Sequence, residues 1–144
     1  PVKVETITTG VTHGADVDLI DQVRSRVRLE GTNQDGQYTI VFCPIVSRVG
    51  SDVEAAMQNM PPNKKVVLVL MHHTRDPDYS TAGRSWSEVY RNVDLEVHVL
   101  FHESVPGLLT CSQNTDAVYE MQTYLQPSKT KINKWNQLNQ KVIA

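Results

Sequence analysis

The chain has 144 residues and a mass of 16.2 kDa, and at about 100–200 residues per domain this predicts one compact domain with one hydrophobic core. Its 40% hydrophobic and 21% charged residues exclude a disordered, collagenous or fibrous chain. The formal net charge of −2 lacks the basic field that non-specific nucleic-acid binding requires. No apolar run approaches the roughly 20 residues that cross a bilayer, so we expect no membrane segment.

The cysteines and the first residues bear on the compartment. Cys43 and Cys111 lie in apolar surroundings and form neither a CxxC pair nor the dense spacing of a disulfide scaffold. We therefore expect both thiols to be reduced. The first residues show no basic region followed by a long apolar stretch, which predicts the absence of a secretory signal. Both observations favour a cytoplasmic protein.

The first elements are a strand, a helix and a second strand. Residues 2–7 form a strand-like run that ends in a loop rich in Thr and Gly at positions 8–14. From Asp16, the expected N-cap, apolar residues recur every three or four positions as far as Leu29 and predict an amphipathic helix, which the segment 31–36 ends. Residues 38–46 are mostly β-branched and aromatic, and the unbroken apolar run at 40–43 predicts a central, parallel strand covered on both faces.

A second helix and a third strand follow. Ser51 and Glu54 fit a capping box, which predicts a helix that begins at Ser51 and runs to about Met60. The run 65–71 is the most apolar in the chain, and its length and β-branching predict a buried strand at the sheet centre.

The last part of the domain repeats the alternation. Ser85 and Glu88 form another capping box, which predicts a short helix. Residues 95–101 alternate between apolar and polar and predict a strand nearer an edge. Positions 108–111 fit either a short strand or a connection, and Asn114 or Thr115 is expected to cap a final helix.

This alternation is the pattern of βαβ crossovers, and it predicts an α/β fold: a three-layer α/β/α sandwich with a mostly parallel, flavodoxin-like or Rossmann-like sheet. We favour the flavodoxin-like strand order. Residues 1–126 form this single α/β domain. Residues 127–144 carry four lysines and spaced apolar residues, which predict a C-terminal basic amphipathic tail, helical and suited to packing on the domain, to a partner or to self-association.

In an open parallel sheet the ligand crevice lies beyond the carboxyl ends of the strands. The loop 8–14 offers hydroxyls and backbone amides to an anion, but it matches neither GxGxxG nor GxxxxGK[ST], so an ordinary connection is the alternative. Loop 74–84 is either a flap over the crevice or a solvated connection. The candidate ligand-binding residues at the strand ends are Thr9, Gly10, Thr12, Arg48, Ser51, His72, His73, Arg75 and His102.

Arginines among these candidates have two interpretations. Arg48 and Arg75 either hold a carboxylate or phosphate of a ligand, or pair with Asp52 and Asp76.

Metal and thiol chemistry are both weakly indicated. His72, His73 and His102 suggest a metal site, but adjacent strand residues point to opposite faces, so His72 and His73 are not expected to share one ion, and no HExxH or CxxC supplies further ligands. We therefore predict no metal and no cofactor. Catalysis by a thiol would pair Cys111 with His73 or His72, but no known nucleophile motif surrounds Cys111.

Three segments carry a resemblance: VSRVGSDVEAAM at 46–57, VVLVLMHHTRDPDY at 66–79 and VLFHES at 99–104. They resemble a family of small uncharacterised proteins from bony fish, and the resemblance implies no activity and no catalytic residue.

The leading hypothesis is a cytosolic, non-enzymatic binding or interaction module. It uses the strand-end crevice, the tail or both, and its partner is an unknown protein or a small anionic ligand. The alternative is a small hydrolase or transferase with His73 and Cys111 in the crevice.

Overall fold

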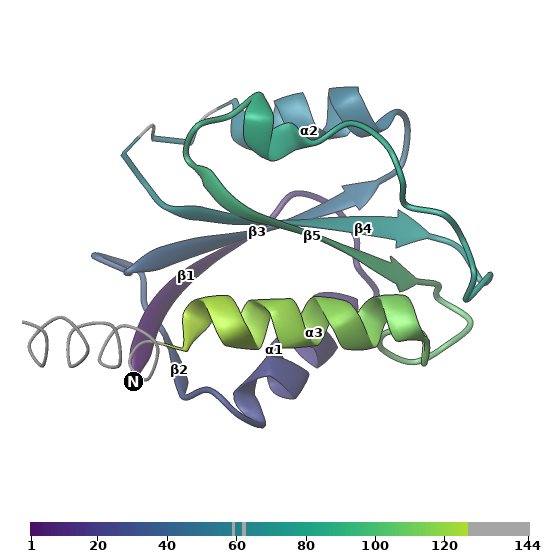
Figure 1. The fold of residues 1–144 in the computed structure, drawn as a ribbon, viewed down its shortest axis with the longest axis horizontal. Helices are drawn as coiled ribbons and strands as arrows, with labels where there is room; N and C mark the ends of the chain where they lie inside the picture. Colours follow the sequence, from purple (N-terminus) through teal and green to yellow (C-terminus); the bar gives the residue numbers. More distant parts are fainter. Residues whose placement is uncertain (59, 62, 127–144) are drawn as a thin grey trace, which may run out of the picture.

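The computed structural model describes residues 1–126 except 59 and 62. Its five-stranded sheet has the order β2-β1-β3-β4-β5, and all four strand pairs are parallel. Helices α1 and α3 cover one face, and α2 and the 3-10 helix η1 cover the other (Figure 1). The predicted three-layer sandwich is confirmed, with the flavodoxin-like order. The elements are β1 (Val2–Thr8), α1 (Ala15–Arg24), β2 (Leu29–Gly31), β3 (Tyr38–Ile45), α2 (Val49–Met57), β4 (Val66–His73), η1 (Trp86–Glu88), β5 (Val93–Phe101) and α3 (Ser112–Leu125).

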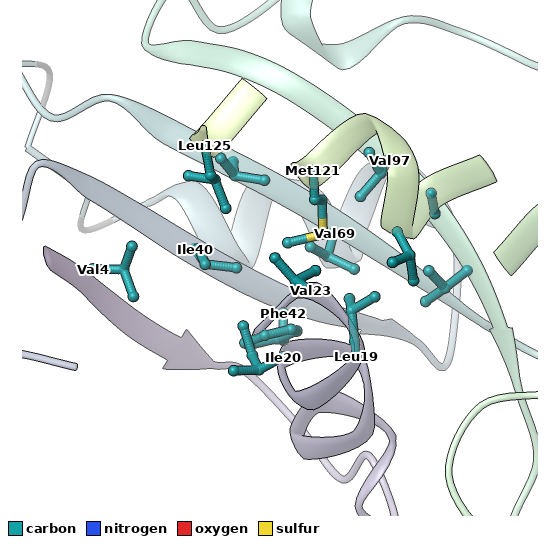
Figure 2. Close-up of a cluster of buried hydrophobic side chains, with 14 of the residues drawn as sticks. Val4, Leu19, Ile20, Val23, Ile40, Phe42, Val69, Val97, Met121 and Leu125 are labelled. Carbon is teal, nitrogen blue, oxygen red and sulfur yellow. The ribbon is translucent and has the colours of Figure 1, made fainter. Parts of the chain in front are cut away.

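The core has a part on each face of the sheet. Successive residues of β4 alternate between the two parts, so that Val69 packs toward α1 and α3 while Leu68 packs toward α2. In the larger part, Val23 of α1 and Met121 of α3 point toward the sheet around Phe42 (Figure 2). Burial on both faces explains why the sequence of this strand is an unbroken apolar run. β4 is an inner strand, but β3 is the middle one.

The first helix differs from its prediction at both ends. Its N-cap is Gly14 rather than Asp16, with a φ of 82°, a left-handed conformation that glycine adopts without steric cost. Leu29, which the periodicity placed in the helix, lies in β2. Val17 is 60% exposed, so the buried stripe runs through other positions of α1.

The capping box expected at the start of α2 does not form. The helix begins before Ser51, and Arg48 occupies the N-cap without a side-chain cap. The carboxylate of Asp52 instead accepts hydrogen bonds from the backbone N–H groups of Val46 at 2.9 Å and Ser47 at 3.0 Å. A residue inside the first turn therefore binds the loop that leads into the helix.

The helix predicted after Ser85 is only the short 3-10 turn η1. Glu96 of β5 accepts hydrogen bonds from the backbone N–H groups of Trp86 at 2.6 Å and Ser87 at 3.2 Å. A carboxylate on a neighbouring strand thus takes the role that the capping box assigned to local side chains.

Neither Asn114 nor Thr115 caps α3 as predicted, because the helix begins at Ser112 and Cys111 is its N-cap. The buried side chain of Asn114 covers the outer edge of β5: its Oδ1 accepts the Leu100 N–H at 2.7 Å, and its Nδ2 donates to the carbonyls of Leu100 at 2.8 Å and Leu109 at 2.7 Å. The segment before the helix is a connection that adds one isolated antiparallel bridge, between Phe101 and Leu108.

Among the described residues, no helix combines the length and apolar character needed to cross a lipid bilayer. The tail predicted at residues 127–144 lies outside the described residues.

Candidate functional site

An open pocket of about 490 Å³ lies at the carboxyl edge of the sheet. β1 and β3 are neighbours there, and the chain continues from them in opposite directions, to β2 and to β4, so this edge contains the topological switch point where open α/β sheets bind ligands. We call this pocket the crevice. Its walls come from the loop after β1 and from the ends of β3, β4 and β5: Val11, His13, Ile45, Val46, His73, Phe101 and Glu103.

Two histidines and a glutamate meet at the crevice. His73 ends β4, and its Nε2 is hydrogen-bonded to Oε2 of Glu103, which follows β5. Nε2 of His102 lies 3.7 Å from Oε1 of the same carboxylate. The two imidazole rings stack with their centroids 4.6 Å apart and their planes at 17°. One nitrogen or oxygen of each residue lies within 4.8 Å of the others, and we call these three residues the histidine–glutamate cluster.

Hydrogen bonds define the charge and orientation of this cluster. The pKa of Glu103 is lowered to about 2, chiefly by its hydrogen bond with His73, and the nearby imidazoles add to the effect. The carboxylate is therefore ionised at neutral pH. Nδ1 of His102 lies 2.8 Å from Oγ of Ser104 and accepts the Ser104 N–H at 3.1 Å, which holds the ring in place.

A second pocket of about 360 Å³ opens on the α2 side of the same edge. Buried His72 lies in its wall, with Nε2 2.9 Å from Nδ1 of His98, whose Nε2 is 2.9 Å from Oε2 of Glu96. If Nε2 of His98 donates its hydrogen bond to Glu96, Nδ1 of His98 accepts the Nε2–H of His72, and Nδ1 of His72 remains an acceptor. Burial, and then the repulsion that a protonated His98 would exert, lowers the pKa of His72 to about 4.

The predicted flap belongs to this second pocket. Residues 79–84 form part of its wall, and the ring of Tyr79 lies 5.8 Å from that of His72. The crevice wall contains no residue of this loop. The loop is thus placed to cover the α2-side pocket.

His72 and His73 lie on opposite faces of the sheet, as the alternation of side chains along a strand predicts. His73 and His102 come together, whereas His72 lies in the other pocket. Glu103 rather than His72 is the residue that joins His73 and His102.

The loop after β1 uses its hydroxyl groups internally. Thr12 Oγ1 donates to Oδ1 of Asp16 at 2.6 Å, and Thr9 Oγ1 donates to a carbonyl of β3 at 3.1 Å. Gly10 packs closely on Pro44, since a Cβ at this position would lie 3.3 Å from the proline ring. The carboxylate of Asp16 therefore already accepts the hydrogen bond of the Thr12 hydroxyl, a donor that a bound anion would need.

The remaining candidates lie away from the crevice walls. Arg48 and Arg75 are exposed, and Ser51 lines a separate hollow between α2 and Tyr90. Among the ion pairs of residues 1–126, apart from 59 and 62, the predicted pairs of Arg48 with Asp52 and of Arg75 with Asp76 are not found.

The thiols occupy two different environments. Cys111 is half-buried at the N-cap of α3, and the crevice walls include His73 but not Cys111. Cys43 is buried in β3, and this burial raises the pKa of its thiol to about 11. The described geometry does not join a thiol to the crevice histidine.

Glu103 was missed as a partner of His73, because this contact depends on the register between β4 and β5. β4 and β5 pair His73 with Phe101, so the residues directly after Phe101 lie within reach of His73. The second pocket did have a signal in the sequence: Glu96 and His98 are two positions apart and therefore share one face of their strand.

Comparisons of the chain with models of protein families, with curated proteins and with solved structures find no match. The resemblance to the fish proteins therefore stays a prediction, and any function has to be argued from the site itself.

Proposed function

We propose that the protein is a non-enzymatic binding module that holds a small ligand in the crevice. The observation that carries this proposal is the position of the crevice, at the switch point of a parallel sheet, with walls from four separate parts of the chain. Ligand sites of open α/β sheets form there because strand ends and the following loops converge.

The size and lining of the crevice support this proposal. Its volume of about 490 Å³ falls within the roughly 300–1,000 Å³ typical of small-molecule sites. Val11, Ile45 and Phe101 give it apolar walls, while His73 and Glu103 give it polar groups that can fix the orientation of a ligand. A hollow of about 650 Å³ between α1 and α3 is larger, but its walls come from these helices and the residues directly after α1, away from the strand ends.

The charge of the crevice restricts its ligand. A ligand with an anionic group finds hydrogen-bond donors in the imidazoles of His13 and His73 but also meets the ionised carboxylate of Glu103. A small anionic ligand therefore fits best if its charge is offset by a cation or if it carries a donor for Glu103.

Ligand screening by thermal unfolding tests the proposal. Nucleotides, sugar phosphates, carboxylic acids and amino acids are added to the protein in two parallel screens, one with a metal chelator and one with added divalent metal ions. A ligand at 100 times its Kd stabilises the folded state by about 2.7 kcal/mol, a readily measured rise in Tm. We expect at least one class to raise the Tm, and each hit to be confirmed by direct titration.

Two matched variants locate the binding. Val46→Trp fills the crevice mouth, because Val46 lines the crevice and is 81% exposed; Val17→Trp adds the same bulk on α1, where Val17 is 60% exposed. We expect Val46→Trp to abolish the Tm shift and Val17→Trp to preserve it. Ligands that bind both variants equally well, or a panel without hits, would contradict the proposal.

We also propose cytoplasmic residence without a nucleic-acid partner. The described cysteines are both free, as expected in a reducing compartment, and the net charge of −2 does not favour phosphate backbones.

A further inference from the structure

We propose that the histidine–glutamate cluster is a binding site for a divalent transition-metal ion, Zn²⁺. This inference rests on the proposed function, since the ion would form part of the crevice wall and would itself be one of the ligands bound there.

The donor set determines the class of ion. His73 and His102 supply imidazole nitrogens and Glu103 supplies a carboxylate oxygen. Two histidines and one glutamate form one of the three-ligand sets that hold Zn²⁺ with an open fourth position. Ca²⁺ and Mg²⁺ are disfavoured, because they prefer sites made of oxygen ligands.

The distances require only side-chain adjustment. Zinc bonds of about 2.0–2.2 Å in a tetrahedron place two ligand atoms roughly 3.3–3.6 Å apart. His73 and Glu103 are already in direct contact, Nε2 of His102 is 3.7 Å from Oε1 of Glu103, and one atom of each residue lies within 4.8 Å of the others. The side chains of His73 and Glu103 are 42% and 47% exposed, so both can rotate toward a common centre without disturbing the core.

A second layer of contacts supports one of the ligands. When Nε2 of His102 binds a metal, its proton moves to Nδ1, which lies 2.8 Å from Oγ of Ser104 and donates to it. Ser104 is exposed, so its backbone N–H, which loses Nδ1 as an acceptor, can bind water. Ser104 is thus a positioning residue: its hydroxyl would stabilise the Nδ1-protonated tautomer of His102 in the metal-bound form, whereas its N–H favours the Nε2-protonated tautomer without the metal.

The ion would also change the charge of the crevice. Two neutral imidazoles and one carboxylate give the cluster a charge of −1, and a divalent cation makes it +1. Since His73 and Glu103 line the crevice, the open coordination position lies beside it. The metal-bound crevice would therefore accept the carboxylate or phosphate group that Glu103 alone repels.

Equilibrium dialysis of the full chain against Zn²⁺ tests the inference, and Co²⁺ serves as a spectroscopic probe through its visible absorption. We expect one Zn²⁺ per chain. His73→Gln and Glu103→Gln should each abolish this binding. Glu120→Gln is the matched control for Glu103→Gln and should leave binding unchanged, because Glu120 is exposed on α3 and belongs neither to the crevice nor to the cluster. Ser104→Ala should weaken binding about 10–100-fold, as the loss of a supporting contact does.

Nitrogen NMR of the imidazoles provides a test that needs no variant. Zn²⁺ should shift the Nε2 signals of His73 and His102 and leave those of His98 unchanged. Absence of Zn²⁺ binding, binding that survives both Gln variants, or shifts confined to other histidines would each overturn the inference. If organic ligands still bind the chelated protein and Val46→Trp blocks them, the proposed function stands while the metal site is refuted.

Discussion

Replacement of Asn114 by alanine should strongly destabilise the domain through two backbone groups. In the native protein its Oδ1 accepts the Leu100 N–H at 2.7 Å and its Nδ2 donates to the Leu109 carbonyl at 2.7 Å. Asn114→Ala leaves both groups without these partners in a buried position. The Leu100 carbonyl keeps a partner, because the Leu109 N–H donates to it at 3.2 Å.

The size of the effect follows from this count. A buried backbone group that loses its only partner costs about 1–3 kcal/mol, so the two groups together cost about 2–6 kcal/mol. Alanine recovers roughly 0.5 kcal/mol through its higher helix propensity. We therefore expect a net loss of about 2–5 kcal/mol in the free energy of unfolding, a large share of the roughly 5–15 kcal/mol that stabilises a domain.

Urea unfolding followed by circular dichroism measures this loss. With a slope of about 2 kcal/mol per molar urea, the midpoint should fall by roughly 1–2.5 M while the slope stays constant. Thr115→Ala on the same helix is the control: its exposed Oγ1 donates only to the Cys111 carbonyl at 3.1 Å, so the change should stay within about 0.5 kcal/mol. Equal stabilities of the two variants would refute the importance of the Asn114 contacts.

Three further predictions concern other parts of the fold. Met121→Ala removes a fully buried side chain and should cost about 2–5 kcal/mol in urea unfolding, whereas Tyr119→Ala, at a position 68% exposed, should cost less than about 0.5 kcal/mol; similar losses would contradict the described packing of α3. Asp52→Ala removes the acceptor of two loop N–H groups and should cost about 0.5–2 kcal/mol by the same assay, and an unchanged midpoint would dispute that role. Cys111 should react with a thiol reagent in the native protein, while Cys43, buried and with its pKa raised to about 11, should react only on unfolding; equal rates measured by mass spectrometry would contradict its burial.

The sequence was sufficient for the layers of the fold because hydrophobic patterning is a strong, local signal. The apolar run around Leu68 predicted a strand buried on both faces, and the alternation through Val97 and His98 predicted an edge strand. Helix ends were predicted less well, since each depended on contacts distant in the sequence. Glu96, on a strand, binds the amides that start η1, and this contact leaves no trace in the local pattern.

The candidate site was only partly predictable for a related reason. The rule that strand ends converge placed His73 and His102 at one edge, and the alternation of side chains separated them from His72. The choice of Glu103 required the register between β4 and β5, which the sequence alone does not provide. Hydroxyl partners such as Asp16 were equally unpredictable, because several acceptors lay near the loop in sequence.

Both borders of the sheet are poorly suited to recruiting a second copy of the chain. β2 is only three residues long, and amide side chains bind the outward-facing backbone of β5, with Gln113 donating to the His98 carbonyl at 2.9 Å beside the contacts of Asn114. Unpaired borders of sheets are common starting points of aggregation. If α3 detaches from β5, the apolar segment 97–101 becomes a template for intermolecular pairing, so the first turn of this helix also protects the protein's solubility.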